Sequence, residues 1–117
     1  MIYIGTLESL IEVLEAEDQN RSVRLGFTAP HSYRGYYDEV AFVPVVGAKA
    51  SVGTMAEAAR SALGATFTGW KGGEYTMYSH TPCWLAHQGD LGEILGPIML
   101  ALMLGYHPFH FMGVIAE

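Results

Sequence analysis

The stretch HSYRGYY, residues 31–37, gathers side chains that could recognise an anionic ligand with a planar ring. An arginine guanidinium binds phosphate or carboxylate through two parallel hydrogen bonds, and a tyrosine offers a flat face for stacking and a hydroxyl. The chain has only six Lys and Arg in total, so an arginine among three tyrosines favours a binding role. The candidate ligand-binding residues here are His31, Tyr33, Arg34, Tyr36 and Tyr37.

A structural alternative explains the same residues without a ligand. Tyr36 and Tyr37 could begin the next strand, and Arg34 could form an ion pair with Asp38 or Glu39. Both interpretations stay open, because a motif in one sequence is a weak signal.

The segment GWKGG, residues 69–73, is a second candidate for anion binding. Its candidate residues are Trp70, Lys71, Gly72 and Gly73. Backbone N–H groups in a glycine-rich loop beside a lysine can hold an anion. The order of residues differs from the phosphate-binding loop G-x-x-x-x-G-K-[ST]. The alternative is a glycine-rich connection within a β-hairpin, and for this segment alone it is the stronger interpretation.

Three possible zinc ligands, His80, Cys83 and His87, lie close together in the sequence. In an extended strand, positions 80 and 83 face opposite sides, and no fourth ligand is evident. We therefore predict no metal site and no cofactor, but a buried cysteine and two ordinary histidines. His107 and His110 also have a spacing that metal ligands can have. Because the other residues of the tail are apolar, we interpret these two histidines as packing residues of the tail.

Catalytic motifs are absent from the sequence: it contains no G-x-S-x-G, H-E-x-x-H or paired-carboxylate pattern. Cys83 beside a histidine could form a nucleophilic pair, although cysteine is a buried residue by default. His31 with Tyr33 and Arg34 could perform acid–base chemistry on a phosphoester. We rank binding above catalysis and assign no catalytic residue.

The charge balance disfavours one class of partner. Twelve Asp and Glu outweigh six Lys and Arg, which gives a net charge of −6. The basic residues are scattered, whereas binding to duplex nucleic acid relies on several phosphate contacts. We predict no duplex nucleic acid partner, while a small anion needs only one or two basic residues.

Cysteine count and hydropathy favour a cytoplasmic protein. One cysteine cannot form an internal disulfide, which suits a reducing compartment. The first residues, MIYIGTLESL, lack the basic region of a signal peptide. The longest apolar stretch, residues 94–106, is too short for a membrane span and contains Pro97. We predict no membrane partner.

The hydrophobic periodicity predicts a single α+β domain over residues 1–117, with a small, mainly antiparallel sheet packed with about three helices. The expected helices are residues 7–16 with Thr6 as N-cap, a helix that begins near Ser51 or Thr54 and runs to about Leu63, and a helix that begins near Gly92 or Gly96 and reaches residue 104. Thr54 and Glu57 have the spacing of a capping box. The expected strands are residues 23–27, 38–46, 74–79 and 82–87, with a loop over residues 28–37.

Hydrophobic residues cover nearly the whole circumference of the last expected helix, residues 94–104, so we expect it to be buried on all sides. One small sheet cannot cover it, whereas a second subunit could. The chain is 50% hydrophobic and only 15% charged, and this composition also favours an oligomer. We predict a homodimer or higher homo-oligomer, with the apolar tail, residues 105–117, at the interface.

Three segments, PHSYRGYYDEVAFVP, SALGATFTGWKGGEYTM and TPCWLAHQGDLGE, resemble a family of small bacteriophage proteins, notably from phages of actinobacteria. The likeness covers roughly residues 6–104 and leaves out the tail. The resemblance implies a phage protein that acts in the cytoplasm of a bacterial host. It does not imply any particular activity.

Three functions remain as hypotheses. The protein could counteract host defence by sequestering a small anionic, nucleotide-like ligand between Arg34, the nearby tyrosines and Lys71. It could be an inhibitor or adaptor that binds a host or phage protein through an apolar surface. It could be a small nucleotide hydrolase that uses His31. Binding ranks first, and the choice between ligand and protein partner stays open.

Overall fold

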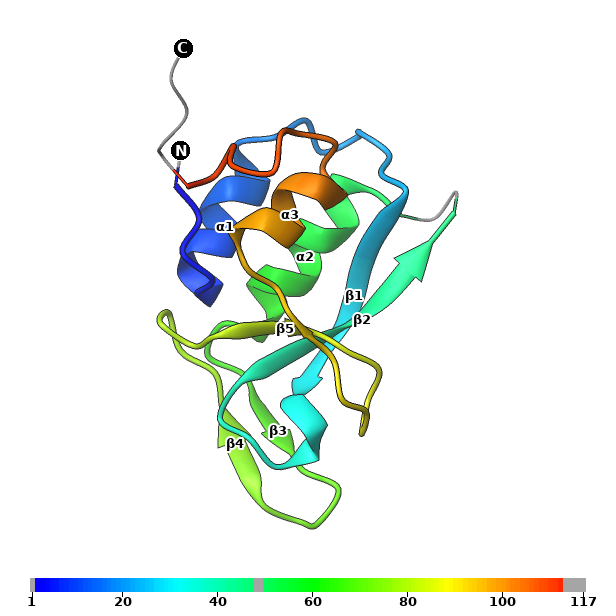
Figure 1. The fold of residues 1–117 in the computed structure, drawn as a ribbon. Helices are drawn as coiled ribbons and strands as arrows, with labels where there is room; N and C mark the ends of the chain where they lie inside the picture. Colours follow the sequence, from blue (N-terminus) through cyan, green and yellow to red (C-terminus); the bar gives the residue numbers. More distant parts are fainter. Residues whose placement is uncertain (1, 48–49, 113–117) are drawn as a thin grey trace.

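A four-stranded sheet lies at the centre of the computed structural model, which describes residues 2–47 and 50–112 (Figure 1). The strands, in sheet order, are β1 (Leu25–Ser32), β2 (Val40–Val46), β5 (Cys83–Leu85) and β6 (Glu93–Ile94). The β1–β2 and β5–β6 pairs are antiparallel, and β2–β5 is parallel. A separate hairpin pairs β3 (Thr66–Thr68) with β4 (Glu74–Thr76). The predicted α+β fold is confirmed.

Three helices complete the described fold: α1 (Leu7–Glu15), α2 (Val52–Ala62) and α3 (Pro97–Met103). As predicted, Thr6 caps α1, because its hydroxyl accepts a hydrogen bond from the Ser9 N–H at 3.4 Å. Ser51 caps α2 in the same way through the Thr54 N–H at 3.2 Å. Within the described residues, none of the helices combines the length and apolar character that a membrane span needs.

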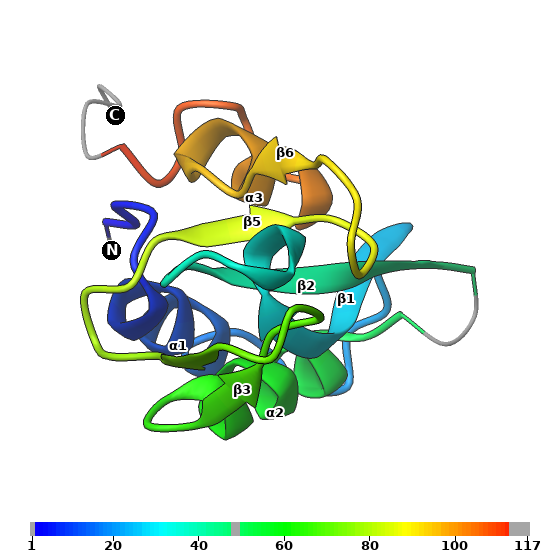
Figure 2. The same ribbon diagram turned by 90° about the horizontal axis from the view of Figure 1, so that it is seen from below.

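The core forms where α2 packs on β1 and α1 packs on α2. Alanines on α2 let the helix approach its neighbours closely, and Ala56, Ala59 and Ala62 are fully buried. Phe27 of β1 and Phe42 of β2 meet in the core with ring centroids 4.5 Å apart. Figure 1 shows the helices at one end of the molecule and the β3–β4 hairpin at the other, and in Figure 2 α1 and α2 lie on one side of the sheet and α3 on the other.

The expected loop over residues 28–37 is wrong in its first half. Strand β1 continues to Ser32 and is followed by a short 3-10 turn, η1 (Tyr33–Gly35). A bulge at Ala29, which has φ 47°, shifts the register between Thr28 and Pro30. The strand tolerates this proline because β1 is an edge strand, where a missing N–H costs no ladder hydrogen bond.

The last helix is also shorter and more exposed than expected. Gly96 is its N-cap and Pro97 its first residue, while residues 93–94 form β6 instead. Ile94, Ile98 and Leu102 are 59%, 44% and 56% exposed, so the helix is not buried on all sides. Hydrophobic residues all around a helix predict full burial only if the rest of the chain is large enough to cover the helix. In this protein the rest of the chain covers one face of α3.

The tail folds back onto the body as far as it is described. Phe111 is buried, and the Tyr3 N–H donates to its carbonyl oxygen at 2.9 Å. The Tyr106 hydroxyl donates to Glu17 at 2.5 Å, and the Arg21 guanidinium lies 5.0 Å from the Tyr106 ring centroid. Residues 113–117 of the predicted interface lie outside the described residues.

Candidate functional site

The turn after β1 is held in shape by Ser32. Its hydroxyl donates to the Tyr37 carbonyl oxygen at 2.6 Å and accepts from the Tyr37 N–H at 3.1 Å. Arg34 and Gly35 both adopt the left-handed region, with φ of 56° and 77°. This conformation is rare for a residue with a side chain.

The hairpin between β3 and β4 is closed by its glycines. The Gly69 N–H donates to the Gly73 carbonyl oxygen at 2.6 Å, and the Gly72 N–H donates to the Gly69 carbonyl oxygen at 2.9 Å. The Gly72 N–H is therefore occupied within the hairpin. The hairpin interpretation of this segment is confirmed, and its predicted contact with an anion stays a prediction.

The turn and the hairpin, far apart in sequence, lie in direct contact. A Cβ atom at Gly69 would lie 2.1 Å from the Gly35 carbonyl oxygen, and one at Gly35 would lie 1.9 Å from Cδ1 of Trp70. The Trp70 indole N–H donates to the Arg34 carbonyl oxygen at 2.9 Å. Only glycines permit this approach, so the two candidate segments form one surface.

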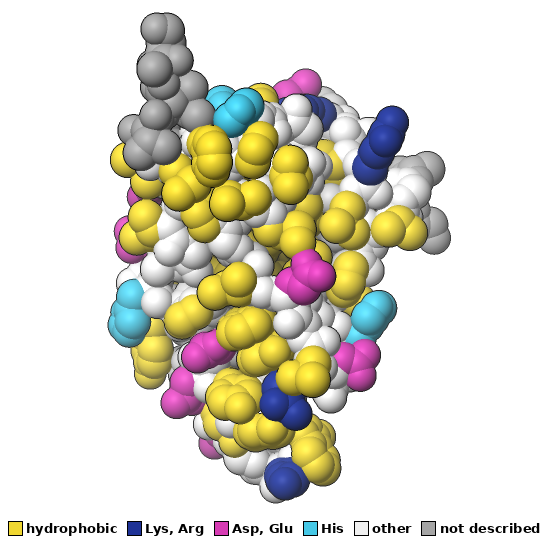
Figure 3. All heavy atoms as spheres, viewed as in Figure 1, with side chains coloured by type: hydrophobic (Ala, Val, Ile, Leu, Met, Phe, Trp, Pro, Cys, Tyr) yellow, Lys and Arg dark blue, Asp and Glu magenta, His cyan; other side chains and the backbone are white. Residues whose placement is uncertain are grey.

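That surface combines two basic side chains with two aromatic faces, and we call Arg34, Tyr36, Trp70 and Lys71 the platform. The Arg34 guanidinium carbon lies 5.6 Å from the Tyr36 ring centroid. The Lys71 ammonium lies 5.9 Å from the Tyr36 centroid and 4.8 Å from that of Trp70. Trp70 is 64% exposed. Figure 3 shows basic and hydrophobic side chains together at this lower end of the molecule.

A chain of adjacent aromatic rings ends at Tyr36 of the platform. Tyr33, which is buried, stacks on Trp84 with centroids 4.1 Å apart and planes within 4°. Tyr37 follows at 5.5 Å from Tyr33, and Tyr36 at 4.7 Å from Tyr37. The Trp84 N–H donates to Glu39 at 2.5 Å. The sequence prediction missed Trp84, although its alternation with buried residues 83 and 85 marks it as facing the other side of the sheet.

His31 lies apart from the platform, inside the protein. Its Nε2 atom is buried without a hydrogen-bond partner, and its Nδ1 lies 3.3 Å from the Ala29 carbonyl oxygen. Burial lowers the pKa of His31 below its ordinary value, and the nearby His87 adds to the effect, against an opposing hydrogen bond to the Ala29 carbonyl oxygen. His31 is therefore neutral at pH 7. Ligand contact by His31 and Tyr33 stays a prediction, since both are buried here.

The platform cations have no acidic partner among the described residues. The described ion pairs join Arg21 to Glu17 and Arg60 to Glu15, at 3.1 and 3.0 Å. Arg34 is in neither, so its expected pairing with Asp38 or Glu39 is absent. The Arg34 and Lys71 charges are thus available to an anion.

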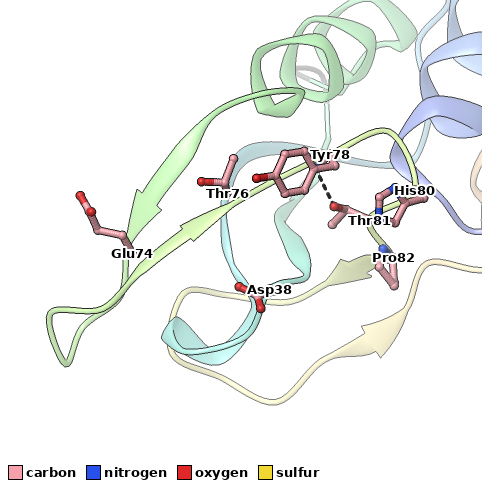
Figure 4. Close-up of a pocket in the computed structure, with 7 residues that line it drawn as sticks. All are labelled: Asp38, Glu74, Thr76, Tyr78, His80, Thr81 and Pro82. Atoms are coloured by element: carbon pink, nitrogen blue, oxygen red, sulfur yellow. Dashed lines mark hydrogen bonds between the residues drawn. The ribbon is translucent and has the colours of Figure 1, made fainter.

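A hollow of about 460 Å³ is a separate feature, since none of the residues that line it belongs to the platform. It is lined by Asp38, Glu74, Thr76, Tyr78, His80, Thr81 and Pro82 (Figure 4). The Tyr78 N–H donates to the Thr81 hydroxyl at 2.7 Å, and the Tyr78 and His80 rings are stacked with centroids 6.1 Å apart. The sequence prediction missed this hollow, because its residues are ordinary polar residues of a turn, a strand and a connection.

An apolar groove of about 420 Å³ lies beside α3, with the exposed side chains of Ile94, Ile98 and Leu102 among its lining. Hydrophobic side chains gather over this part of the molecule in the upper half of Figure 3. The groove is the second feature that could bind a partner.

The residues considered as metal ligands do not gather in the described part of the chain. In residues 2–47 and 50–112, no three side chains of His, Cys, Asp and Glu gather to hold a metal ion. Cys83 is buried, and burial raises its pKa to about 12, so it is a protonated thiol at neutral pH. His110 stacks on Tyr106 at 4.1 Å, as expected from tail packing.

Comparison with known proteins found no match among protein-family models, curated proteins or solved structures. Function therefore has to be inferred from the site itself.

Proposed function

We propose that the protein acts by binding, and that the platform takes a small anionic ligand with a planar ring, of the nucleotide class. The observation that carries the proposal is the contact between the turn and the hairpin, which places Arg34 and Lys71 over the ring of Tyr36 and Lys71 over that of Trp70. The planar ring of the ligand can stack on one of these aromatic side chains while the phosphate of the ligand binds to Arg34 and Lys71.

Stacking and charged hydrogen bonds would be the sources of binding energy for a small ligand. Stacking of a nucleic acid base on an aromatic side chain contributes about 1–3 kcal/mol per base. A hydrogen bond to a charged group contributes about 1.5–3 kcal/mol. One stacked ring with two such bonds gives a gross interaction of about 4–9 kcal/mol, from which the cost of immobilising the ligand is subtracted.

The position of His31 favours binding over hydrolysis. A general acid or base must reach the substrate within hydrogen-bond distance, directly or through one water. His31 is buried, and its ring is linked to its own strand at Ala29. A nucleotide on the platform would therefore stay intact.

The biological setting follows from the family resemblance. A phage protein that binds a nucleotide without consuming it would sequester a nucleotide signal used in host defence, in the cytoplasm of the host. The platform supports the ligand class, and the resemblance supports the setting.

The apolar groove beside α3 favours a second candidate function, an inhibitor or adaptor that binds a host or phage protein. Exposed aliphatic residues such as Ile98 and Leu102 are common at the centre of protein interfaces. This function would not need the platform.

A thermal-shift screen with ribonucleotides, cyclic nucleotides and ADP-ribose tests the proposal. A ligand at one hundred times its dissociation constant stabilises by about 2.7 kcal/mol, or several degrees. Arg34→Ala and Lys71→Ala should each reduce the shift strongly, while Arg24→Ala, which removes an exposed cation elsewhere, should not.

Two outcomes would contradict this proposal. If no nucleotide shifts the transition, ligand binding at the platform is wrong, and the protein-docking function takes its place. If the nucleotide binds but disappears at substoichiometric protein, the protein is an enzyme.

A further inference from the structure

The apolar groove beside α3 lies toward the opposite end of the protein from the platform (Figures 1 and 3). Ile94 of β6 and Ile98 and Leu102 of α3 line it together, and each is 44–59% exposed. Ile98 and Leu102 are four positions apart, so they lie on one side of the helix. Among the described residues that line the groove, Glu93 alone is charged. Depletion of charge around hydrophobic side chains is typical of the centre of a protein interface.

The N-terminal segment borders the groove and carries further exposed aliphatic side chains. The Tyr3 hydroxyl donates to the carbonyl oxygen of Leu95, the residue after Ile94, at 2.5 Å. Tyr3 itself is buried, whereas Ile2 and Ile4 on either side of it are 55% and 69% exposed. The groove and this segment therefore offer five exposed aliphatic side chains within a small part of the surface.

The exposed area of these five side chains is close to what a stable dimer needs. A standard interface covers about 800 Å² on each partner, of which roughly 450 Å² is apolar. Five side chains that are between 44% and 69% exposed present on the order of 400 Å², if a large hydrophobic side chain offers about 150 Å² when free.

A second copy of the chain fits this surface better than it fits the charged surfaces of the protein. In a two-fold dimer the same patch meets itself, so an apolar face with little charge is complementary to its own copy. The net charge of −6 opposes association of two copies through their charged surfaces. Strand β6 offers an edge of only two residues, so side chains rather than strand pairing must form the contact.

We propose that the protein is a two-fold symmetric dimer in which the grooves of two copies pack on each other. A two-fold axis that crosses α3 at right angles reverses the helix direction, which sets Ile98 of each copy against Leu102 of the partner subunit. The sequence alone places the interface at the tail, but Phe111 of the tail is buried within its own subunit. This inference goes beyond nucleotide binding and does not depend on it, since both platforms would stay open.

Sedimentation velocity of the full chain over a range of concentrations tests the dimer. The chain has a mass of 12.8 kDa, so the dimer has twice that mass. Ile98→Glu and Leu102→Lys should each sediment as the monomer at concentrations where the wild-type protein is a dimer, because each variant places an unpaired charge in an apolar contact. Leu63→Glu is the matched control and should stay dimeric, because Leu63, at the end of α2, is 45% exposed against 44% for Ile98.

Mixing the two charged variants identifies the occupant of the groove as a second copy. In a mixed dimer the new glutamate at position 98 faces the new lysine at position 102 of the other chain, while the remaining Ile98 and Leu102 keep their apolar contact. The mixture should therefore recover the dimer mass that each variant has lost, and added salt should weaken this recovery.

Three results would overturn the proposal. A wild-type protein that stays monomeric at every concentration would leave the groove to a different protein. Dimers that persist in both Ile98→Glu and Leu102→Lys would place the interface elsewhere on the subunit. Monomeric variants that do not pair when they are mixed would overturn the antiparallel contact between the two α3 helices.

Discussion

The indole N–H of Trp70 donates a 2.9 Å hydrogen bond to the main-chain carbonyl oxygen of Arg34, across a sequence separation of 36 residues. The bond joins the tip of the β3–β4 hairpin to the turn after β1. A glycine in each of the two segments makes the close approach possible. Gly35 leaves room for the indole ring, and Gly69 leaves room for the turn. The platform exists only where these two segments meet.

Gly35→Ala should break this junction. The added Cβ would lie 1.9 Å from Trp70 Cδ1, and the residue would also be strained at φ 77°. Gly72→Ala is a matched control, because Gly72 has φ 91° and no atom near its missing Cβ. The control should lose about 1–2 kcal/mol from backbone strain alone. Gly35→Ala should lose more and change the Trp70 fluorescence; equal losses measured by urea denaturation would contradict the contact.

Acid should destabilise the protein through His31. Its pKa in the folded state lies below the unfolded value of about 6.5, so the unfolded chain binds more protons in that interval. Stability is therefore highest above pH 6.5 and falls as the pH drops toward the folded pKa, by up to about 1.4 kcal/mol per pH unit.

The His31 contribution can be isolated by comparing slopes. His31→Gln should flatten the pH dependence of the unfolding free energy between pH 6.5 and 5.5, whatever its effect on stability at pH 8. His107→Gln, at an exposed position in the tail, should keep the wild-type slope. A wild-type slope in His31→Gln would show that His31 does not titrate on unfolding.

The tail should be anchored by the Tyr106 hydroxyl. Tyr106→Phe removes its hydrogen bonds to Glu17 at 2.5 Å and to the Arg21 guanidinium at 3.1 Å, while Arg21 still pairs with Glu17. We expect a loss of about 0.5–1.5 kcal/mol in chemical denaturation. Tyr36→Phe, at a half-exposed ring on the platform, is the control and should change stability by less than about 0.5 kcal/mol.

The two faces of α3 should respond differently to substitution. Leu100 is fully buried, so Leu100→Ala should cost about 2–5 kcal/mol. Leu102 is 56% exposed, so Leu102→Lys should leave the thermal transition almost unchanged. Sedimentation of the Leu102→Lys variant also tests the predicted oligomer. If this face joins subunits, the variant should sediment as a smaller species than the wild-type protein.

The fold class and the first two helices were predictable from the sequence. Leucine spacing and the cap Thr6 are local signals, which act within a few residues and need no knowledge of the rest of the chain. For α2 the sequence left the start open between Ser51 and Thr54, and the structure has Ser51 as the cap. The last helix was predicted too long, because the buried or exposed state of Ile98 and Leu102 depends on what lies over them. That information is absent from the periodicity.

The residues of the candidate site were also visible in the sequence as chemical types, but their arrangement was not. The sequence singled out Arg34, Tyr36, Trp70 and Lys71 in two separate segments. Only the packing of the hairpin against the turn brought them together. The physical reason is the sequence distance over which each interaction acts. Helix caps and strand alternation depend on neighbours in the sequence, whereas a contact between residues 36 positions apart depends on the tertiary structure.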